Sequence, residues 1–321
     1  FDLGGHSLLA VRLIAEIESE TGRRIGLATL FRSPTIAELA AGIESSEVPD
    51  RAPSLVPIQP RGSRPPFFCI HANTGIVYYR GLARHLGAEQ PLYGLQSQGL
   101  DGRCAPYETI EEMAAHYIRE IREIQPEGPY LLGGHSFGGK VAFEMARLLH
   151  TQGQRVALLA LFDTPSSPFR PGLAGMELLR DRVHVHAGRL RDLPAGQPIS
   201  YVAKRARTAL GAVRRILAER WLLLRHPAER AQRRVLEANT RAIVAYVPAP
   251  YPGRITLFLA GETRTIASEP DLGWGRLCGG GVEIHEIPGS HSSMLSDEAS
   301  LRPLSERLAD CLRRAQSGLS A

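Results

Sequence analysis

Short apolar runs alternate with longer amphipathic stretches along most of the chain from residue 66 onward. The runs are rich in β-prone residues and lie at 67–70, 92–95, 130–133, 157–162, 255–260 and 282–287. Between the early runs, apolar residues recur at helical spacing near 78–86, 109–125 and 138–152. This alternation predicts an α/β fold in which helices cover both faces of a mostly parallel sheet.

About 90 residues separate the fourth apolar run from the fifth, which is too long for an ordinary crossover connection. Helical patterns near 176–192, 199–224 and 227–246 occupy this segment. We therefore expect an inserted helical lid at about 164–250, above the carboxyl edge of the sheet.

The expected lid is basic, with 16 Lys and Arg against 6 Asp and Glu. No aromatic-interleaved platform or zinc module accompanies the arginines, so nucleic-acid binding is not favoured. A solvated helical face is the more common explanation of such a run, and a docking surface for an acidic partner is the second.

The first 65 residues have a different pattern. Residues 1–45 predict a small helical domain, in which Thr35 is a candidate N-cap for the last helix. Residues 46–65 carry five prolines and predict a semi-extended interdomain linker. The main domain then occupies residues 66–321, and no internal repeats occur.

Composition narrows the class of protein. With 43% hydrophobic and 22% charged residues, the chain of 321 residues is ordinary for a globular protein. No apolar run approaches the roughly 18 residues of a membrane span, and we expect no signal peptide at the start of the chain. The four cysteines have no zinc-ligand spacing, so we expect reduced thiols, a cytoplasmic location and no metal.

The most informative motif is Gly134-x-Ser136-x-Gly138, which stands between an apolar run and an amphipathic stretch. A strand, a sharp turn and a helix place a serine hydroxyl at the top of a sheet, and flanking glycines let the turn close. This context favours a nucleophilic serine at Ser136 over a chance serine in a glycine-rich turn.

A serine nucleophile on this fold requires an acid and a histidine later in the chain. Asp163 directly follows the apolar run at 157–162, and His291 follows the last run. Both are thus expected at the same sheet edge as Ser136. Asp271 and Glu262 remain alternative acids. Other histidines are less well placed, at positions 71, 135 and 285.

The expected chemistry is acyl transfer. His291 would remove the proton of Ser136, and Asp163 would hold the productive tautomer of the imidazole. The oxyanion would be stabilised by the backbone N–H of Phe137 and by a second donor in the loop 71–75, for which Asn73 is the candidate.

The segment Asp2-Leu-Gly-Gly-His-Ser7-Leu8 resembles the attachment motif of peptidyl and aryl carrier proteins in nonribosomal peptide synthetases. The resemblance implies a 4′-phosphopantetheine arm on Ser7, where a helix N-terminus favours the phosphodiester. Carriers of this family have a helix before the motif, which is missing here, so we expect a truncated all-α carrier domain at 1–45.

Residues 66–315 resemble the terminal thioesterase domains of nonribosomal peptide and polyketide synthases, which have the α/β-hydrolase fold. The motifs that carry the resemblance are the elbow around Ser136, the strand end at Asp163 and the Pro-Gly-Ser-His segment that ends at His291. The oxyanion loop departs from the family, with His-Ala-Asn-Thr-Gly in place of His-Pro-x-Gly-Gly. This leaves the identity of the second donor open.

Together the two resemblances imply an enzyme that releases an acyl or peptidyl chain from a phosphopantetheine carrier, by hydrolysis or macrocyclisation. Its partners would be the carrier-bound substrate and upstream synthetase modules, with no nucleic acid and no membrane. Two alternatives are a stand-alone-type serine esterase with a vestigial carrier and a non-catalytic carrier or scaffold module.

Overall fold

The structure is a computed structural model, which describes residues 13–14, 16–18, 20–23, 29–30, 35–45, 53–72, 75–166, 227–267 and 269–317. Ser7, Asn73 and the expected lid helices at 176–192 and 199–224 lie outside the described residues. Within the described part of the chain, no helix has the length and apolar character needed to span a membrane.

Seven strands form one sheet in the order β1-β3-β2-β4-β5-β6-β7. They are β1 Leu55–Gln59, β2 Phe67–Ile70, β3 Leu92–Leu95, β4 Tyr130–His135, β5 Val156–Phe162, β6 Ile255–Ala260 and β7 Val282–Ile287. β1 is antiparallel to β3, and all other neighbouring pairs in the sheet are parallel. The mostly parallel sheet of an α/β-hydrolase fold is therefore confirmed, with β4 at its centre.

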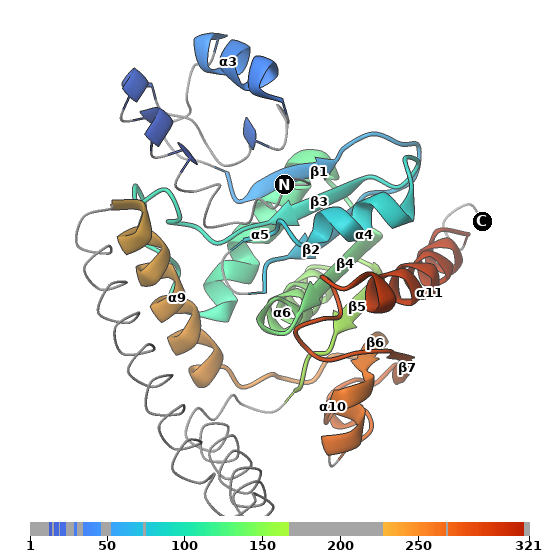
Figure 1. Ribbon diagram of the computed structural model, residues 1–321. Coiled ribbons are helices and arrows are strands. Elements are labelled where there is room, and N and C mark those ends of the chain that lie inside the picture. The colour runs from blue at the N-terminus through green and yellow to red at the C-terminus, as the bar shows by residue number, and fades with distance from the viewer. Residues whose placement is uncertain are drawn as a thin grey trace, which may run out of the picture.

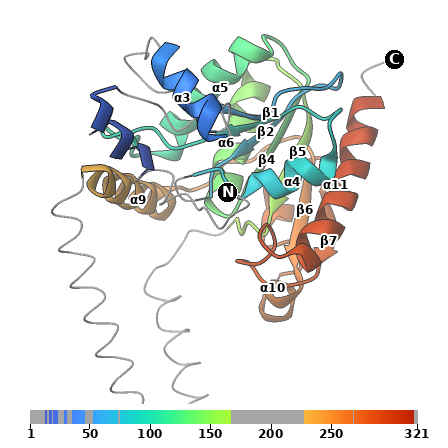
Figure 2. The same cartoon turned by 45° about the horizontal axis from the view of Figure 1, so that its top comes forward.

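Helices cover both faces of the sheet (Figures 1 and 2). They are α4 Tyr79–Leu86, α5 Ile110–Ile124, α6 Phe137–Thr151 and α11 Glu298–Ser317, whereas α9, Pro227–Ala245, lies to one side of the sheet (Figures 1 and 2). Because side chains alternate along a strand, Phe67 and Cys69 pack with α4 and α11, whereas Phe68 and Ile70 pack with α5 and α6. This two-sided burial explains why the strands read as continuous apolar runs.

The strand β1 lies inside the range expected to be linker. Val56 is fully buried and Ile58 packs against the core. Apolar residues thus occupy every second position of this short strand, although prolines surround it. β1 is an edge strand, where the missing N–H of Pro57 is tolerated. The ordered sheet thus begins eleven residues before the expected start of the main domain.

The helix α9 falls at the end of the expected lid, but its C-terminal half is part of the main core. Ala242 and Tyr246 pack in the same cluster as α5 and α6. The Tyr246 hydroxyl also donates a 3.0 Å hydrogen bond to the buried carboxylate of Glu144. α9 is therefore firmly anchored where it returns to the sheet.

The last helix of the expected carrier domain is α3, Ile36–Ser45. Its N-cap is Thr35, as predicted, because the Thr35 hydroxyl accepts a 3.2 Å hydrogen bond from the Glu38 backbone. The Glu38 carboxylate in turn accepts from the Thr35 backbone at 3.1 Å. The pair forms a capping box that starts the helix at Ile36.

Candidate active site

Ser136 stands in a sharp turn between β4 and α6, with φ 54° and ψ −113°. The turn closes only because its flanks lack side chains. A Cβ at Gly134 would overlap the backbone of Gly138, and a Cβ at Gly138 would overlap the carbonyl oxygen of Ile70. The Ser136 N–H donates a 3.0 Å hydrogen bond to Phe162 on β5. The structure therefore contains the predicted strand–turn–helix elbow.

Asp163 directly follows β5 and is 1% exposed. Its carboxylate accepts hydrogen bonds from the Ala260 N–H at 3.0 Å and from the Thr263 hydroxyl at 2.7 Å. Burial alone would raise the pKa of this carboxyl, but hydrogen bonds from His291, Thr263 and Ala260 outweigh it and lower the pKa below its ordinary value. The group is thus held as a carboxylate.

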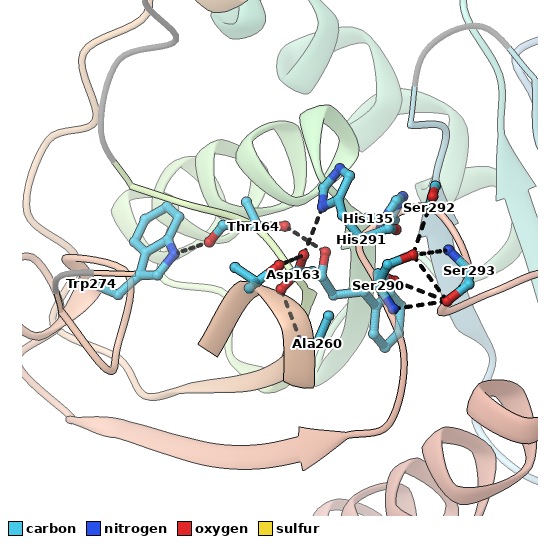
Figure 3. A network of polar contacts seen from close by, with 11 residues as sticks. His135, Asp163, Thr164, Ala260, Trp274, Ser290, His291, Ser292 and Ser293 are labelled. Carbon is cyan, nitrogen blue, oxygen red and sulfur yellow. Dashed lines mark hydrogen bonds and ion pairs between the residues drawn. The ribbon is translucent and has the colours of Figure 1, made fainter. Parts of the chain in front are cut away.

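His291 lies in the loop after β7, and its Nδ1 atom is 2.7 Å from Oδ2 of Asp163 (Figure 3). Because the carboxylate is an acceptor, Nδ1 carries the proton and Nε2 is left as the basic nitrogen. The side chain is 47% exposed, so part of the imidazole is open to solvent. This is the tautomer that a general base requires.

The structure has no hydrogen bond between the Ser136 hydroxyl and His291, both of which it describes. The two residues nevertheless lie in neighbouring segments, since the ring of His135 is 4.6 Å from that of His291. In enzymes without substrate such a bond is commonly long or poorly aligned.

The alternative acids, Asp271 and Glu262, make other contacts in the described part of the chain. The Asp271 carboxylate accepts hydrogen bonds from Gly273 N at 2.9 Å and Gly275 N at 2.8 Å, at the start of the 3-10 turn η1, Trp274–Arg276. Glu262 is exposed on α10, Gly261–Ile266, and its N–H donates to Gly289. Neither carboxylate contacts His291 among the described residues.

His71 is fully buried at the end of β2. Its Nε2 atom lies 2.9 Å from the Tyr117 hydroxyl, and its ring stacks on that of Phe137 with centroids 5.4 Å apart. His71 therefore packs against Phe137, the residue that follows Ser136. The next N–H in that loop, of Ala72, donates to the Tyr78 hydroxyl.

His285 belongs to a group of possible metal ligands on β7 and α11, together with Glu283 and Cys311. Arg314 already donates hydrogen bonds to Glu283 at 2.6 Å and to Cys311 at 3.3 Å. The Arg314 guanidinium thus already supplies a positive charge to this cluster. We interpret the cluster as an ion-pair network that joins β7 to α11.

Reading the sequence missed two residues in or near the site. Thr263 reaches Asp163 across 100 residues of sequence, and no local pattern indicates that contact. Lys140 lies one turn after Ser136 on α6 and is 1% exposed, and burial lowers its pKa to about 8. The sequence does contain a signal for Lys140, because it is a charged residue within the stretch 138–152, where apolar residues recur at helical spacing.

Comparison with known proteins agrees with the geometry. Residues 65–312 match the family model of the thioesterase domain, and residues 1–43 match that of the phosphopantetheine attachment site. The chain is 34% identical over 93% of its length to a probable non-canonical nonribosomal peptide synthetase, CymA, of Salinispora arenicola. It is 33% identical over 92% of its length to chondramide synthase cmdD of Chondromyces crocatus. It spans only 4% and 8% of those two proteins.

Solved structures point the same way. Holo-AB3403, a four-domain nonribosomal peptide synthetase bound to AMP and glycine, is 28% identical with a TM-score of 0.62 over 96% of this chain and 24% of its own. The NocB thioesterase domain in covalent complex with a fluorophosphonate nocardicin G analogue shares the fold, at 24% identity and a TM-score of 0.56, over 82% of this chain and 99% of its own. The chain belongs to the thioesterase domain family and is a carrier and thioesterase region of the nonribosomal peptide synthetase kind.

Proposed function

We propose that Ser136, His291 and Asp163 form a catalytic triad that releases an acyl or peptidyl chain from a carrier-bound thioester, through an acyl-enzyme on Ser136. The observation that carries this proposal is the 2.7 Å contact between His291 Nδ1 and the buried Asp163 carboxylate, beside a serine in a strained elbow. The thioesterase family membership supports the same reaction class.

The first half-reaction forms the acyl-enzyme. Nε2 of His291 takes the proton of the Ser136 hydroxyl while Oγ attacks the thioester carbonyl carbon. The tetrahedral intermediate collapses, the C–S bond breaks, and the leaving sulfur takes the proton from His291. A small movement of the Ser136 or His291 side chain must precede this step, because the two share no hydrogen bond in the substrate-free structure.

The second half-reaction frees the acyl group. Water, or a nucleophile within the acyl chain itself, gives its proton to His291 and attacks the Ser136 ester. The ester C–O bond breaks, and Ser136 recovers its proton. Water yields a linear acid, whereas an internal nucleophile yields a ring, so the mass of the product separates the two outcomes.

Negative charge on the substrate oxygen requires donors in both half-reactions. The Phe137 N–H, at the N-terminus of α6, is well placed for this because helix N-termini favour anions. Asn73 is proposed as the second donor and Ser7 as the attachment site of the phosphopantetheine arm. Both lie outside the described residues.

The nucleophile can be tested with a fluorophosphonate, which forms a stable adduct with an activated serine. We expect one adduct on the wild-type chain, located on Ser136 by peptide mapping, and none on Ser136→Ala. A matched control is Ser292→Ala, since Ser292 adjoins the catalytic histidine and its hydroxyl contacts only Ser290 among the described side chains. That variant should be labelled like the wild type.

Three results would contradict the proposal. An adduct on another residue of Ser136→Ala would mean that the nucleophile lies elsewhere. A wild-type chain that folds but takes up no label would favour the non-catalytic scaffold. Equal turnover of carrier-bound thioesters and simple esters would favour the stand-alone esterase, whereas the proposed function requires that the carrier-bound substrate be used more efficiently.

A further inference from the structure

His135 is the last residue of β4 and immediately precedes the elbow serine. Its imidazole lies against that of His291, with ring centroids 4.6 Å apart and planes inclined by 33° (Figure 3). Its Nε2 atom is 3.0 Å from the backbone carbonyl oxygen of His291. A carbonyl oxygen can only accept a hydrogen bond. Nε2 of His135 must therefore carry a proton and donate it.

His291 has few other supports. Among the residues that the structure describes, His291 makes two polar contacts. Its side chain bonds to the Asp163 carboxylate, and its backbone carbonyl oxygen accepts a hydrogen bond from His135. The neighbouring turn is held by the hydrogen bond from Ser290 N to the Ser293 hydroxyl at 2.8 Å and by the fully buried Met294. Neither of these restrains the imidazole, which is half exposed. One face of that ring rests on His135.

The charge of His135 matters because His291 becomes an imidazolium during catalysis. Burial, together with the neighbouring His291, lowers the pKa of His135 to about 4, although Asp163 and the hydrogen bond to the His291 backbone act in the opposite direction. From α4, the Tyr79 hydroxyl accepts the backbone N–H of His135 at 3.2 Å, and burial raises the pKa of Tyr79, so it is neutral. His135 therefore meets His291 as an uncharged ring at neutral pH.

We propose that His135 is a positioning residue for His291: its Nε2–H ties the carbonyl of the histidine loop to the elbow, and its ring supports one face of the catalytic imidazole. The inference rests on the proposed function of Ser136 and His291. It gives the residue between Gly134 and Ser136 a role that the elbow motif alone does not require. The orientation of the His291 ring, and with it the access of its Nε2 to the serine, then depends on His135 as well as on the bond from Nδ1 to Asp163.

Two substitutions separate the two contacts. His135→Phe keeps a flat ring but loses the donor, and His135→Gln keeps an amide donor but loses the ring. We expect each to lower kcat on a small acyl thioester by about tenfold, the effect of one hydrogen bond or one ring contact, with KM within about twofold of wild type. The rate of Ser136 labelling by the fluorophosphonate should fall by the same factor as kcat.

His285→Gln is the matched control, because His285 also stacks on an aromatic ring, that of Phe258, and also makes a 3.0 Å polar contact, to Glu283. It lies on the far side of β6 from Asp163 and should leave kcat within about twofold. The number of active sites, titrated by total fluorophosphonate uptake, should equal that of wild type in every variant.

The proposal is overturned if both His135 variants turn over like the wild type at each titrated site. It is also overturned if their activity falls only because fewer sites can be titrated, since that identifies a purely structural role. These results differ from a failure of the proposed function, in which the wild-type chain itself would not be labelled on Ser136.

Discussion

Nδ1 of His291 lies 2.7 Å from Oδ2 of Asp163, although 128 positions separate the two residues in the chain. The sheet brings them together. Asp163 follows β5 and His291 follows β7, and β6 lies between those two strands with all three parallel. The Asp163 N–H and carboxylate both bond to β6, at Phe258 and Ala260. The strand β6 therefore fixes the position of Asp163, and the Asp163 carboxylate in turn holds His291.

Asp163→Asn should reduce kcat on the order of 10⁴-fold, because the amide would favour the wrong tautomer of His291. Steady-state turnover of an acyl thioester measures this. Asp271→Asn is the control: it weakens a turn cap on η1 and should lower the melting temperature without a comparable loss of kcat. An inactive Asp271→Asn beside a near-wild-type Asp163→Asn would show that the acid is misassigned.

Thr263→Val should make stability depend differently on pH. The pKa of Asp163 is depressed in the folded chain, so the carboxylate stabilises the fold above the ordinary pKa of about 4, and this contribution is lost as the pH falls through the folded value. Without the Thr263 hydroxyl, we expect the free energy of unfolding to fall by about 2 kcal/mol at pH 7 and by less below pH 4.

Urea unfolding at several pH values tests this expectation. Thr265→Val is the matched control, because the Thr265 hydroxyl donates to the Glu262 carbonyl on the same short helix and does not reach the acid. Its effect should be small and independent of pH. A pH-independent loss in Thr263→Val would contradict the account of the Asp163 pKa.

Gly138→Ala should destabilise the elbow, because the new Cβ would overlap the carbonyl oxygens of Ile70 and His71. Overpacking of this kind costs about 1–3 kcal/mol, and thermal unfolding should show a melting temperature several degrees lower. In Gly261→Ala the nearest atom is Ile287 O at 3.6 Å, an ordinary contact, so its melting temperature should stay near wild type. Equal tolerance of both changes would rule out the steric argument.

Glu120→Gln should weaken the hydrogen bonds that hold the start of β1 against α5. The Glu120 carboxylate on α5 accepts hydrogen bonds from the backbone of Ser54 and Leu55 and lies 2.8 Å from His116 Nε2. An amide can accept these bonds with only one oxygen, so we expect faster hydrogen exchange across 55–59 and a loss of about 1–3 kcal/mol in stability. Glu108→Gln breaks an exposed pair with Arg241 and should change neither. Unchanged exchange in Glu120→Gln would show that β1 is held by its partner strand alone.

The sequence could predict the sheet and the elbow because both are local patterns. The six apolar runs match β2 to β7 within two residues at each end. Given the order serine, acid, histidine that the elbow motif implies, Asp163 and His291 were selected because each follows the end of a predicted strand. β1 was hidden among prolines, which are tolerated there only because the strand lies at an edge. The helix α11 was also missed, although Leu301, Leu304, Leu308 and Leu312 recur along it at helical spacing.

The details of the site depended on contacts between distant segments. Thr263 approaches Asp163 only after β6 and α10 have packed. His135 was set aside as a residue inside the elbow, and its bond to the His291 carbonyl spans 156 positions. Such contacts leave no periodicity and no motif in the sequence, so a single sequence does not predict them.

The early start of β1 also limits how far the carrier can move. α3 ends at Ser45 and β1 begins at Leu55, so nine residues, 46–54, connect them. Fully extended, they reach at most about 32 Å. A carrier on so short a tether meets its own thioesterase at an effective concentration on the order of millimolar. Even a weak contact between the two is then well populated, and a carrier on another chain competes only at comparable concentration.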